Sequence, residues 1–221
     1  MDRNDIFTQL CIMSQKMEKM GLVGGTAGNI SFRLPGEDLV AITPSGIPYD
    51  LYTNELMCVV DLEGRLIEGT VKPSSETPLH TMLHRHLKGN NAIVHTHSPF
   101  ATTFAVLGEP IKAVGLESIK FGAPEIMCTN GFITPGSSRL GEAVIETLDR
   151  QPGAKAALLQ NHGLIAIGNT IEDALNLANT IEFIARLYFQ ARCIGEPKVL
   201  SAEQISKQIQ FYAEKNRETN N

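Results

Sequence analysis

The sequence contains no tryptophan, and its four cysteines form no Cys-x-x-Cys pair. Scattered single cysteines argue against a disulfide framework or a zinc knuckle, so we expect reduced cysteines that pack inside a cytoplasmic protein. No stretch approaches the roughly 18 apolar residues of a membrane span. The first residues, MDRNDIFTQL, lack a basic segment followed by an apolar one, so no signal peptide is predicted.

An excess of basic residues is also missing, because the formal net charge at pH 7 is −5. Broad nucleic-acid binding gains affinity by releasing counterions from phosphates, which requires a basic surface. We therefore expect neither nucleic acid nor a membrane as a partner, although a small anion can still bind locally. With 221 residues, of which 43% are hydrophobic, the chain is expected to fold as one domain over residues 1–221.

The apolar residues recur with helical spacing in some segments and with extended spacing in others. Helices are predicted over residues 5–20, 73–87, 99–108, 137–150 and 170–195, with a polar helix from about residue 201. Strands are predicted at 91–98, in a hairpin around 61–64 and on both sides of residues 161–163. The glycine- and proline-rich segment 109–136 predicts short strands and loops. We expect an α/β fold, a single mixed domain whose central, largely antiparallel sheet has helices on both faces.

Two of the six histidines, His95 and His97, stand two residues apart at the end of the apolar run AIVHTHS. Side chains at i and i+2 of a strand share a face, so both imidazoles can reach one metal ion. A polar strand end that meets solvent explains the same pattern. His162 follows another apolar run and precedes Gly163, so the three histidines together would make an open zinc site. The alternative for His162 alone is a buried histidine with satisfied hydrogen bonds.

A second histidine pair, His80 and His84, has the i, i+4 spacing of helical zinc sites. No glutamate follows the first histidine, so the metalloprotease interpretation fails. We interpret His84 and His86 as surface or interface residues. His80 lies one helical turn beyond Glu76, and its role is left open.

The motif PSSE at 73–76 places two hydroxyls and a carboxylate at a predicted helix start. An ordinary N-cap formed by Ser74 or Ser75 explains it. Backbone N–H groups and hydroxyls at a helix start also suit a phosphate, with the carboxylate of Glu76 aimed at nearby chemistry. The turns GTAGNIS and TPSG add glycine-opened backbone, although neither matches a Walker or dinucleotide-binding pattern. Together with the histidines, these motifs predict metal-assisted chemistry on a small phosphorylated molecule.

The ordered set GTAGNIS, TPSGIPY, PSSE, VHTHS and LLQNHGLIA closely resembles the class II aldolase/adducin family, most of all its L-fuculose-phosphate aldolase branch. Order and spacing match from about Gly21 to Gln190. The resemblance implies a zinc-dependent aldolase, an aldehyde-lyase that reversibly cleaves a ketose 1-phosphate, with L-fuculose 1-phosphate as the first choice. The products would be dihydroxyacetone phosphate and a short aldehyde such as L-lactaldehyde. A homotetramer with active sites between subunits is also implied.

The resemblance gives each motif a role. His95, His97 and His162 would hold one Zn²⁺ per subunit, with Mn²⁺ or Co²⁺ as alternatives, and Glu76 would be a fourth ligand. Glu76 would also be the catalytic acid/base, moving the carbon-bound proton while zinc stabilises the enediolate. The substrate phosphate would be bound by residues of the three turns, namely Gly28, Asn29, Ser45, Gly46, Ser74 and Ser75.

Three other functions stay open within the same family. An L-ribulose-5-phosphate 4-epimerase resembles the chain in HTHS but typically carries aspartate where Glu76 stands. A methylthioribulose-phosphate dehydratase is the second, and a non-catalytic adducin-like module, which would lack the zinc histidines, is the third.

The chain departs from the aldolase branch in the stretch NGFITPGS, where Phe132 replaces a tyrosine supplied by a neighbouring subunit. A phenyl ring cannot donate the hydrogen bond of a phenol. This difference makes a deoxypentulose 1-phosphate a further candidate substrate. Tyr212 in the tail is a candidate for another active-site tyrosine of the family.

Overall fold

The computed structural model describes residues 2–87 and 92–219, with side chains described through residue 211. A seven-stranded antiparallel sheet runs in the order β4-β3-β2-β1-β5-β9-β8. Its strands are β1 (Asn29–Arg33), β2 (Leu39–Ile42), β3 (Cys58–Asp61), β4 (Leu66–Glu68), β5 (Ala92–Thr96), β8 (Ala156–Leu159) and β9 (Gly163–Gly168). A separate pair joins β6 (Ile111–Lys112) to β7 (Glu125–Ile126) within the segment predicted to hold short strands.

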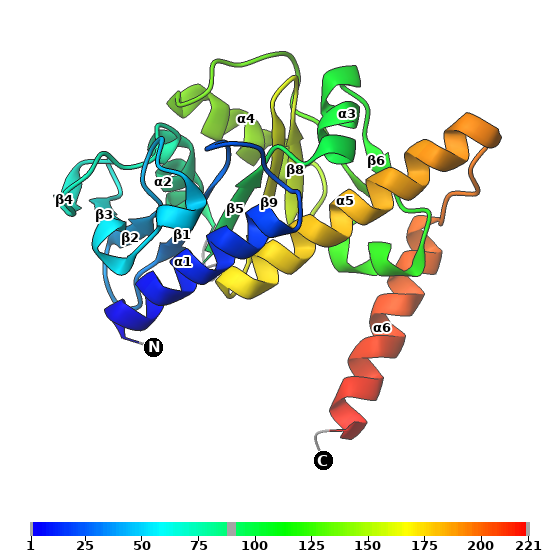
Figure 1. Ribbon diagram of the computed structural model, residues 1–221. Coiled ribbons are helices and arrows are strands. Elements are labelled where there is room, and N and C mark those ends of the chain that lie inside the picture. The colour runs from blue at the N-terminus through cyan, green and yellow to red at the C-terminus, as the bar shows by residue number, and fades with distance from the viewer. Residues whose placement is uncertain (1, 88–91, 220–221) are drawn as a thin grey trace.

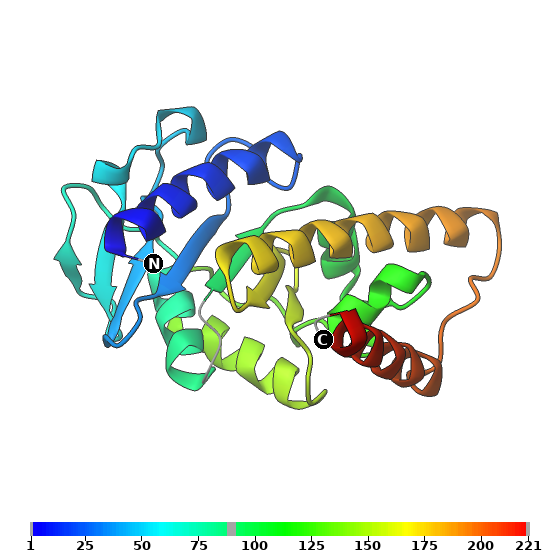
Figure 2. The same cartoon turned by 90° about the horizontal axis from the view of Figure 1, so that it is seen from below.

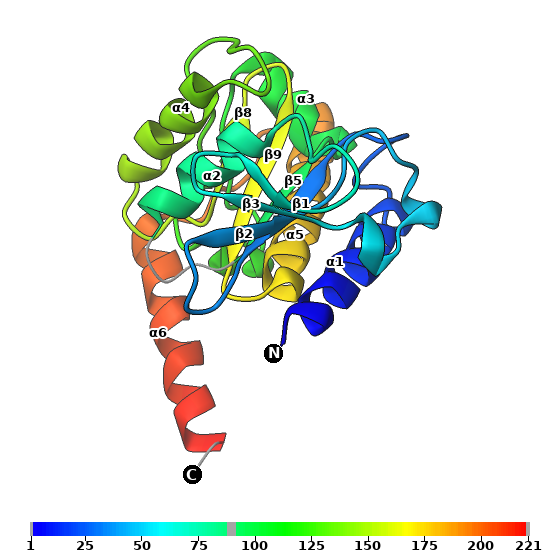
Figure 3. The same cartoon turned by 90° about the vertical axis from the view of Figure 1, so that its left-hand side faces the viewer.

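Helices cover both faces of the sheet. The first face carries α1 (Arg3–Lys19), α3 (Pro99–Leu107) and α5 (Ile171–Ile194), and the second carries α2 (Thr77–His86) and α4 (Ser138–Asp149), as Figures 1 and 3 show. Figure 2 shows α1 and α5 running along the same side of the molecule. Short 3-10 helices connect the layers, namely η1 (Tyr49–Leu51), η2 (Asn54–Leu56) and η3 (Leu116–Phe121). The predicted mixed α/β domain with helices on both faces is confirmed.

Alternation along the central strands decides which side chains meet which helices. In β5, Ala92 and Val94 join the apolar cluster formed with α1, α3 and α5, whereas Ile93 joins the cluster beneath α2 and α4. His95 follows Ile93 by two residues and therefore lies on the α2 side. Because β5 is hydrogen-bonded to β1 and β9, residues at the ends of these three strands come together.

The last helix, α6 (Ala202–Thr219), begins beside η3 and extends away from the body of the molecule in Figure 1. Tyr212 belongs to α6, but its side chain lies outside the described part of the chain. Its suggested role in the active site therefore stays a prediction.

All four cysteines are free thiols, as expected from their scattered positions. Cys11, Cys58 and Cys128 are buried, and burial raises the pKa of each thiol to about 11. Such thiols stay protonated at neutral pH and act as packing residues. Across the described ranges, no helix is both long enough and apolar enough to span a bilayer.

Candidate active site

One pocket of about 320 Å³ gathers every residue predicted to bind the metal or the phosphate or to act as acid/base. Its walls come from the loop before β1, the turn after β2, the start of α2, the end of β5 and the β8–β9 turn. The predicted residues that line it are Gly28, Asn29, Ser45, Gly46, Ser74, Ser75, Glu76, His95, His97 and His162. A larger hollow of about 450 Å³, lined by Lys120, Lys155 and Asp173 among others, contains none of them. Their shared location supports one site, while their individual roles remain predictions.

The imidazoles of His95, His97 and His162 form a compact triangle. Ring centroids are 4.8 Å apart for His95 and His97, 4.7 Å for His95 and His162, and 4.9 Å for His97 and His162. One nitrogen from each ring lies within 4.8 Å of the other two. In tetrahedral zinc sites, Zn–N bonds of about 2.0–2.1 Å place ligand nitrogens about 3.3 Å apart. The triangle can close on one ion with small side-chain movements.

The backbone of the β8–β9 turn brings His162 to the other two histidines. Asn161 adopts a left-handed conformation with φ of 57°, which asparagine tolerates better than most residues. At Gly163, an added Cβ would lie 2.2 Å from the carbonyl oxygen of Thr96. The glycine thus allows β9 to pair closely with β5 at the point where the histidines converge.

A backbone contact fixes the tautomer of His95. Its Nδ1 lies 3.0 Å from the carbonyl oxygen of Leu164, and only an Nδ1–H can donate to that acceptor. The neutral ring therefore presents an unprotonated Nε2 to the pocket. This arrangement, a backbone carbonyl behind a histidine, is common at metal sites because it orients the ring.

Glu76 lies at the start of α2, with its side chain almost fully buried beneath the histidines. Its Oε2 is 3.0 Å from Nε2 of His95, and its Oε1 is 3.4 Å from Nε2 of His162. Neither carboxylate oxygen has a hydrogen-bond donor in good geometry. Burial raises the pKa of Glu76, and His162, His97 and the Asn29 side chain partly offset this effect.

The capping role of PSSE differs from the expectation. Glu76 itself occupies the N-cap position of α2, without a capping side-chain hydrogen bond, so neither Ser74 nor Ser75 is the N-cap. The Oγ of Ser74 instead accepts a hydrogen bond from the Glu76 backbone N–H at 3.2 Å. The reason is local: Pro78 at the helix start and the turn of Ser74 leave Glu76 as the last non-helical residue.

The donor set fits a divalent metal ion. Burial lowers the pKa of His95 to about 3 and of His162 to about 4, so both rings are neutral at pH 7. A neutral buried histidine is ready to ligate without first losing a proton. An ion held by the three rings would give the unpartnered Glu76 oxygens a positively charged partner. Three histidines with a carboxylate nearby match the ligands that zinc and related transition metals prefer.

The glycine loop before β1 forms the opposite wall of the pocket. Gly28 has φ of +82°, and an added Cβ would lie 2.8 Å from the carbonyl oxygen of His95. The hydroxyl of Tyr49 donates to the carbonyl oxygen of Ala27 at 2.6 Å, which ties the loop to η1. Tyr49 lies inside the motif TPSGIPY, yet the sequence interpretation gave it no role. A buried tyrosine hydroxyl needs a partner, and that requirement was the available signal.

The turns TPSG and PSSE lie side by side next to this loop. The N–H of Ser45 donates to the carbonyl oxygen of Lys72 at 2.9 Å, and the N–H of Ser74 donates to that of Thr43 at 3.0 Å. These two bonds place the hydroxyls of Ser45 and Ser74 on one rim of the pocket. Such a rim of hydroxyls, amides and glycines suits an anion.

His84 is not a surface residue, which corrects the sequence interpretation. It is 6% exposed, and its Nε2 lies 2.8 Å from Oγ of Ser31 in β1. His86 is exposed as expected, 3.5 Å from Asp149. The i, i+4 spacing did not predict this burial. Helix α2 packs against α4, and His84 also contacts Ser31 of β1, so the helix buries a wider stripe than packing against one neighbour would.

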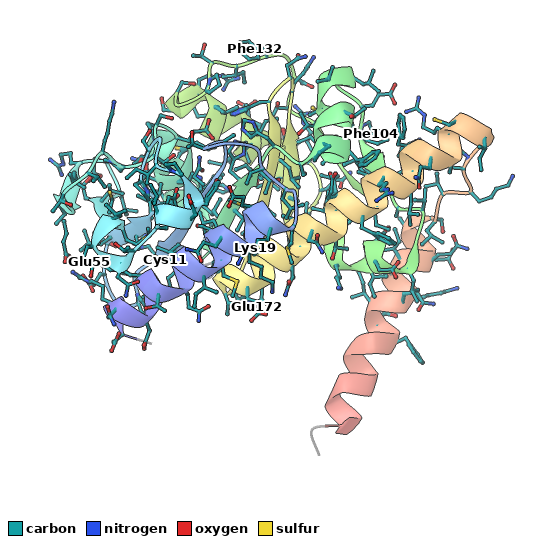
Figure 4. The ribbon with its side chains drawn as sticks, viewed as in Figure 1. Cys11, Lys19, Glu55, Phe104, Phe132 and Glu172 are labelled. Carbon is teal, nitrogen blue, oxygen red and sulfur yellow. The ribbon has the colours of Figure 1, made fainter. Side chains whose placement is uncertain are left out.

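Phe132 lies far out on the loop between β7 and α4, where Figure 4 shows it at the top of the molecule. Its side chain is 62% exposed and does not line the pocket of its own chain. The exposed part of the ring faces solvent or another molecule.

The sequence also matches known proteins over nearly its whole length. The model of the class II aldolase and adducin N-terminal domain matches residues 8–189. The chain belongs to this family. Class II aldolases depend on a metal ion and act on small sugar phosphates, which agrees with the histidine triangle and the anion rim.

Named relatives of this class II aldolase include a 5-deoxy-D-ribulose 1-phosphate aldolase from Bacillus thuringiensis serovar kurstaki. It is 40% identical over 93% of this chain and 96% of its own length. An L-fuculose phosphate aldolase from Escherichia coli K12 is 37% identical over 93% of both chains. A solved L-fuculose 1-phosphate aldolase superposes with a TM-score of 0.88 at 29% identity, covering 95% of this chain and 96% of the other. The prediction of an aldolase is confirmed.

Proposed function

We propose that the protein is a zinc-dependent aldolase that splits a deoxyketose 1-phosphate into dihydroxyacetone phosphate and a short, methyl-terminated aldehyde. The observation that carries the proposal is the pocket, in which three histidines, one buried carboxylate and a phosphate-type rim face one another. The whole chain, residues 1–221, acts as one domain in this proposal.

His95, His97 and His162 would hold the zinc ion, and Glu76 would be a fourth ligand. Zinc supplies a Lewis acid for the negative charge that develops on the substrate's carbonyl oxygen. The rings need no deprotonation at neutral pH, because burial lowers the pKa of His95 and His162 well below 7. The carbonyl of Leu164 keeps His95 in the ligating tautomer.

Glu76 is the acid/base residue. In cleavage, the C4 hydroxyl gives its proton to solvent water, and the C3–C4 bond breaks to release the aldehyde while its electron pair stays on C3. Glu76 then donates a proton to C3. In synthesis, Glu76 removes the C3 proton of dihydroxyacetone phosphate. Burial raises its pKa toward the working pH, which favours a carboxyl that both takes and gives a proton.

The phosphate of the substrate binds at the rim formed by Gly28, Asn29, Ser45, Gly46, Ser74 and Ser75. Hydroxyls and an amide there offer donors without a fixed positive charge. The reacting carbons then lie over Glu76 and the histidines, because both groups of residues line the same 320 Å³ pocket.

The two candidate substrates differ in the aldehyde that they would release. L-fuculose 1-phosphate would release L-lactaldehyde, and 5-deoxyribulose 1-phosphate would release acetaldehyde, which lacks one CHOH group. We favour 5-deoxyribulose 1-phosphate for two reasons. The relative with that name is 40% identical, and Phe132 stands where the L-fuculose-phosphate branch has a tyrosine, so the chain lacks that phenol's hydrogen bond near the aldehyde oxygen.

We further propose a cytoplasmic homotetramer with active sites between subunits. Large apolar side chains are exposed along α3 and α5, among them Leu107, Phe183, Leu187 and Ile194. Several exposed apolar side chains on two neighbouring helices are typical of a protein interface. In a tetramer, the exposed Phe132 loop would reach the pocket of a neighbouring subunit. Sedimentation of the purified protein tests the assembly, and a monomer mass of 24.1 kDa would contradict it.

Product analysis with the zinc-loaded protein tests the function. Each of L-fuculose 1-phosphate, 5-deoxyribulose 1-phosphate and L-ribulose 5-phosphate is supplied separately, and dihydroxyacetone phosphate is measured with a coupled NADH assay. We expect release from both ketose 1-phosphates, with the higher kcat/KM for the 5-deoxy sugar. C4 epimerisation of the 5-phosphate without release would instead support the epimerase. Methylthioribulose 1-phosphate is supplied as a fourth substrate, and loss of water from it would support the dehydratase.

A further inference from the structure

A continuous line of buried polar side chains runs from α2 through β1 to the pocket. Nε2 of His84 lies 2.8 Å from Oγ of Ser31, and that Oγ lies 2.6 Å from Nδ1 of His80. Nε2 of His80 then lies 2.5 Å from Oδ1 of Asn29, which lines the pocket. Exposure is 0% for Ser31 and His80, 4% for Asn29 and 6% for His84. We call these three residues behind Asn29, His84–Ser31–His80, the relay.

The chemistry at the pocket end sets the direction of every hydrogen bond in the relay. Oδ1 of Asn29 is the atom that faces Nε2 of His80. An amide oxygen only accepts, so this contact leaves the NH₂ group of Asn29 for the pocket that the residue lines. Nε2 of His80 therefore carries its proton and Nδ1 does not. Ser31 then donates to His80 Nδ1, and its oxygen accepts from Nε2–H of His84.

We propose that the relay positions Asn29, holding its amide so that both N–H bonds point into the pocket toward the anionic oxygens of the substrate. Without it, the amide could rotate by half a turn and present its carbonyl oxygen, which a phosphate repels. Ser31, His80 and His84 touch neither the pocket nor the histidine triangle in this scheme. They are positioning residues that act through Asn29.

The hydrogen bonds of the relay keep one direction because neither His80 nor His84 gains a second proton near neutral pH. Burial lowers the pKa of His84 to about 3 and lowers that of His80 well below its ordinary value. A doubly protonated His80 would point a donor at Ser31 and reverse that bond. Asn29, Ser31 and Arg33 share one face of β1, and Arg33 closes the outer end by donating to the His84 carbonyl oxygen at 3.4 Å.

Two substitutions of His80 test the contacts of its Nε2 and its Nδ1 separately. The amide of His80→Gln reaches the place of Nε2 and can still donate to Asn29, whereas the shorter His80→Asn reaches only the place of Nδ1. We expect KM for the ketose 1-phosphate to rise about five- to ten-fold in His80→Asn, the loss of roughly one oriented hydrogen bond. In His80→Gln it should stay within about two-fold, and kcat should change little in either variant.

A double-mutant cycle shows whether the effect passes through Asn29. In an Asn29→Ala background, His80→Asn should leave KM unchanged, because the amide that it positions is gone. Val144→Ala is the matched control, since Val144 is fully buried in the same layer but lies on α4, outside the relay. It should lower the unfolding temperature without raising KM. If His80→Asn does not fold, Ser31→Ala, which removes only a hydroxyl, replaces it in the same cycle.

The tautomers give a second readout that needs neither metal nor substrate. In protein labelled with ¹⁵N at histidine only, long-range ¹H–¹⁵N correlation spectra report which ring nitrogen is protonated. We expect an Nε2–H tautomer for both His80 and His84, assigned through the His80→Gln and His84→Gln variants. An Nδ1–H tautomer for His80 would overturn the proposal.

The kinetic arm depends on the proposed phosphate-binding role of Asn29, and the two failures look different. If Asn29→Ala leaves KM unchanged, the role of Asn29 in the proposed function is wrong, and the tautomers alone decide the relay. If Asn29→Ala raises KM but His80→Asn and His80→Gln behave alike, the proposed function stands and the relay is refuted.

Discussion

His95 and His97 place their Nε2 atoms 3.0 Å apart at the mouth of the pocket. Because the carbonyl of Leu164 takes the Nδ1–H of His95, the proton between the two Nε2 atoms can come only from His97 when both rings are neutral. Burial lowers the pKa of each ring, so this neutral state dominates at pH 7. The two nitrogens are therefore arranged to share either a proton or a metal ion.

Alanine at His95, His97 or His162 should remove most of the bound metal together with aldolase activity, because two rings cannot hold the ion that three enclose. The matched control is His86→Ala, whose side chain is 41% exposed beside Asp149. Metal-to-protein ratios measured by plasma mass spectrometry after gel filtration check this. A full complement of metal in the His162→Ala protein would refute the triad.

Ser75→Ala should weaken binding of the phosphorylated substrate and leave the chemistry intact. A hydrogen bond to a charged group is worth about 1.5–3 kcal/mol, so KM should rise roughly ten- to a hundred-fold. Ser75 is exposed on the pocket rim, so the substitution should not change stability. Kinetics with a phosphorylated and an unphosphorylated ketose check the assignment, and equal discrimination by parent and variant would contradict it.

Glu76→Gln should abolish proton transfer while preserving the shape of the site. General-base catalysis typically contributes about 10²–10⁴-fold, and a loss in that range is expected. The direct measurement is deuterium exchange: with dihydroxyacetone phosphate alone in heavy water, the parent should label C3. The variant should still bind the ligand and retain metal, yet exchange far more slowly. Exchange at the parent rate would assign the base to another group.

His84→Gln should flatten the acid side of the stability profile. The pKa of His84 is about 3 in the folded protein, against about 6.5 when unfolded. Between these values only the unfolded chain binds the proton, so stability that is fully present above about pH 6.5 is lost as the pH falls. Removing this group should reduce the slope of the free energy of unfolding by up to about 1.4 kcal/mol per pH unit.

Urea unfolding of the parent and of His84→Gln at several pH values between about 4 and 6.5 measures this slope. The exposed His86→Gln is the control, and its slope should match that of the parent. An unchanged slope in His84→Gln would mean that the buried ring is protonated in the folded protein. Arg33, which faces His84 and lowers its pKa, makes that outcome unfavourable.

The sequence predicted the architecture and ten of the fourteen residues that line the pocket, because periodicity and local motifs carry that information. The apolar run into His95 predicted β5, and the turn around Asn161 and Gly163 predicted the β8–β9 hairpin. These features depend on neighbours in the chain. The family resemblance then placed the separate motifs in one site.

The relay could not be predicted, because it depends on which residue of β1 lies beneath α2. Ser31 is an ordinary strand serine in the sequence, and only the pairing of β1 with β5 places it under His80 and His84. The burial of His84 was misjudged for the same reason. Composition predicted short strands within 109–136, but β6 and β7 are two residues long each, too short for periodicity to place them.

Gly163 and Phe132 differ in how far a substitution at each position would disturb the three histidines. Any side chain at Gly163 would enter the space next to the Thr96 carbonyl, 3.3 Å from ring carbons of His95 and His97, and would disturb the three rings together. The Phe132 ring, in contrast, is 62% exposed and can be exchanged without disturbing that centre. In the proposed function, substitutions on this loop can therefore change the choice of aldehyde while the three histidines stay constant.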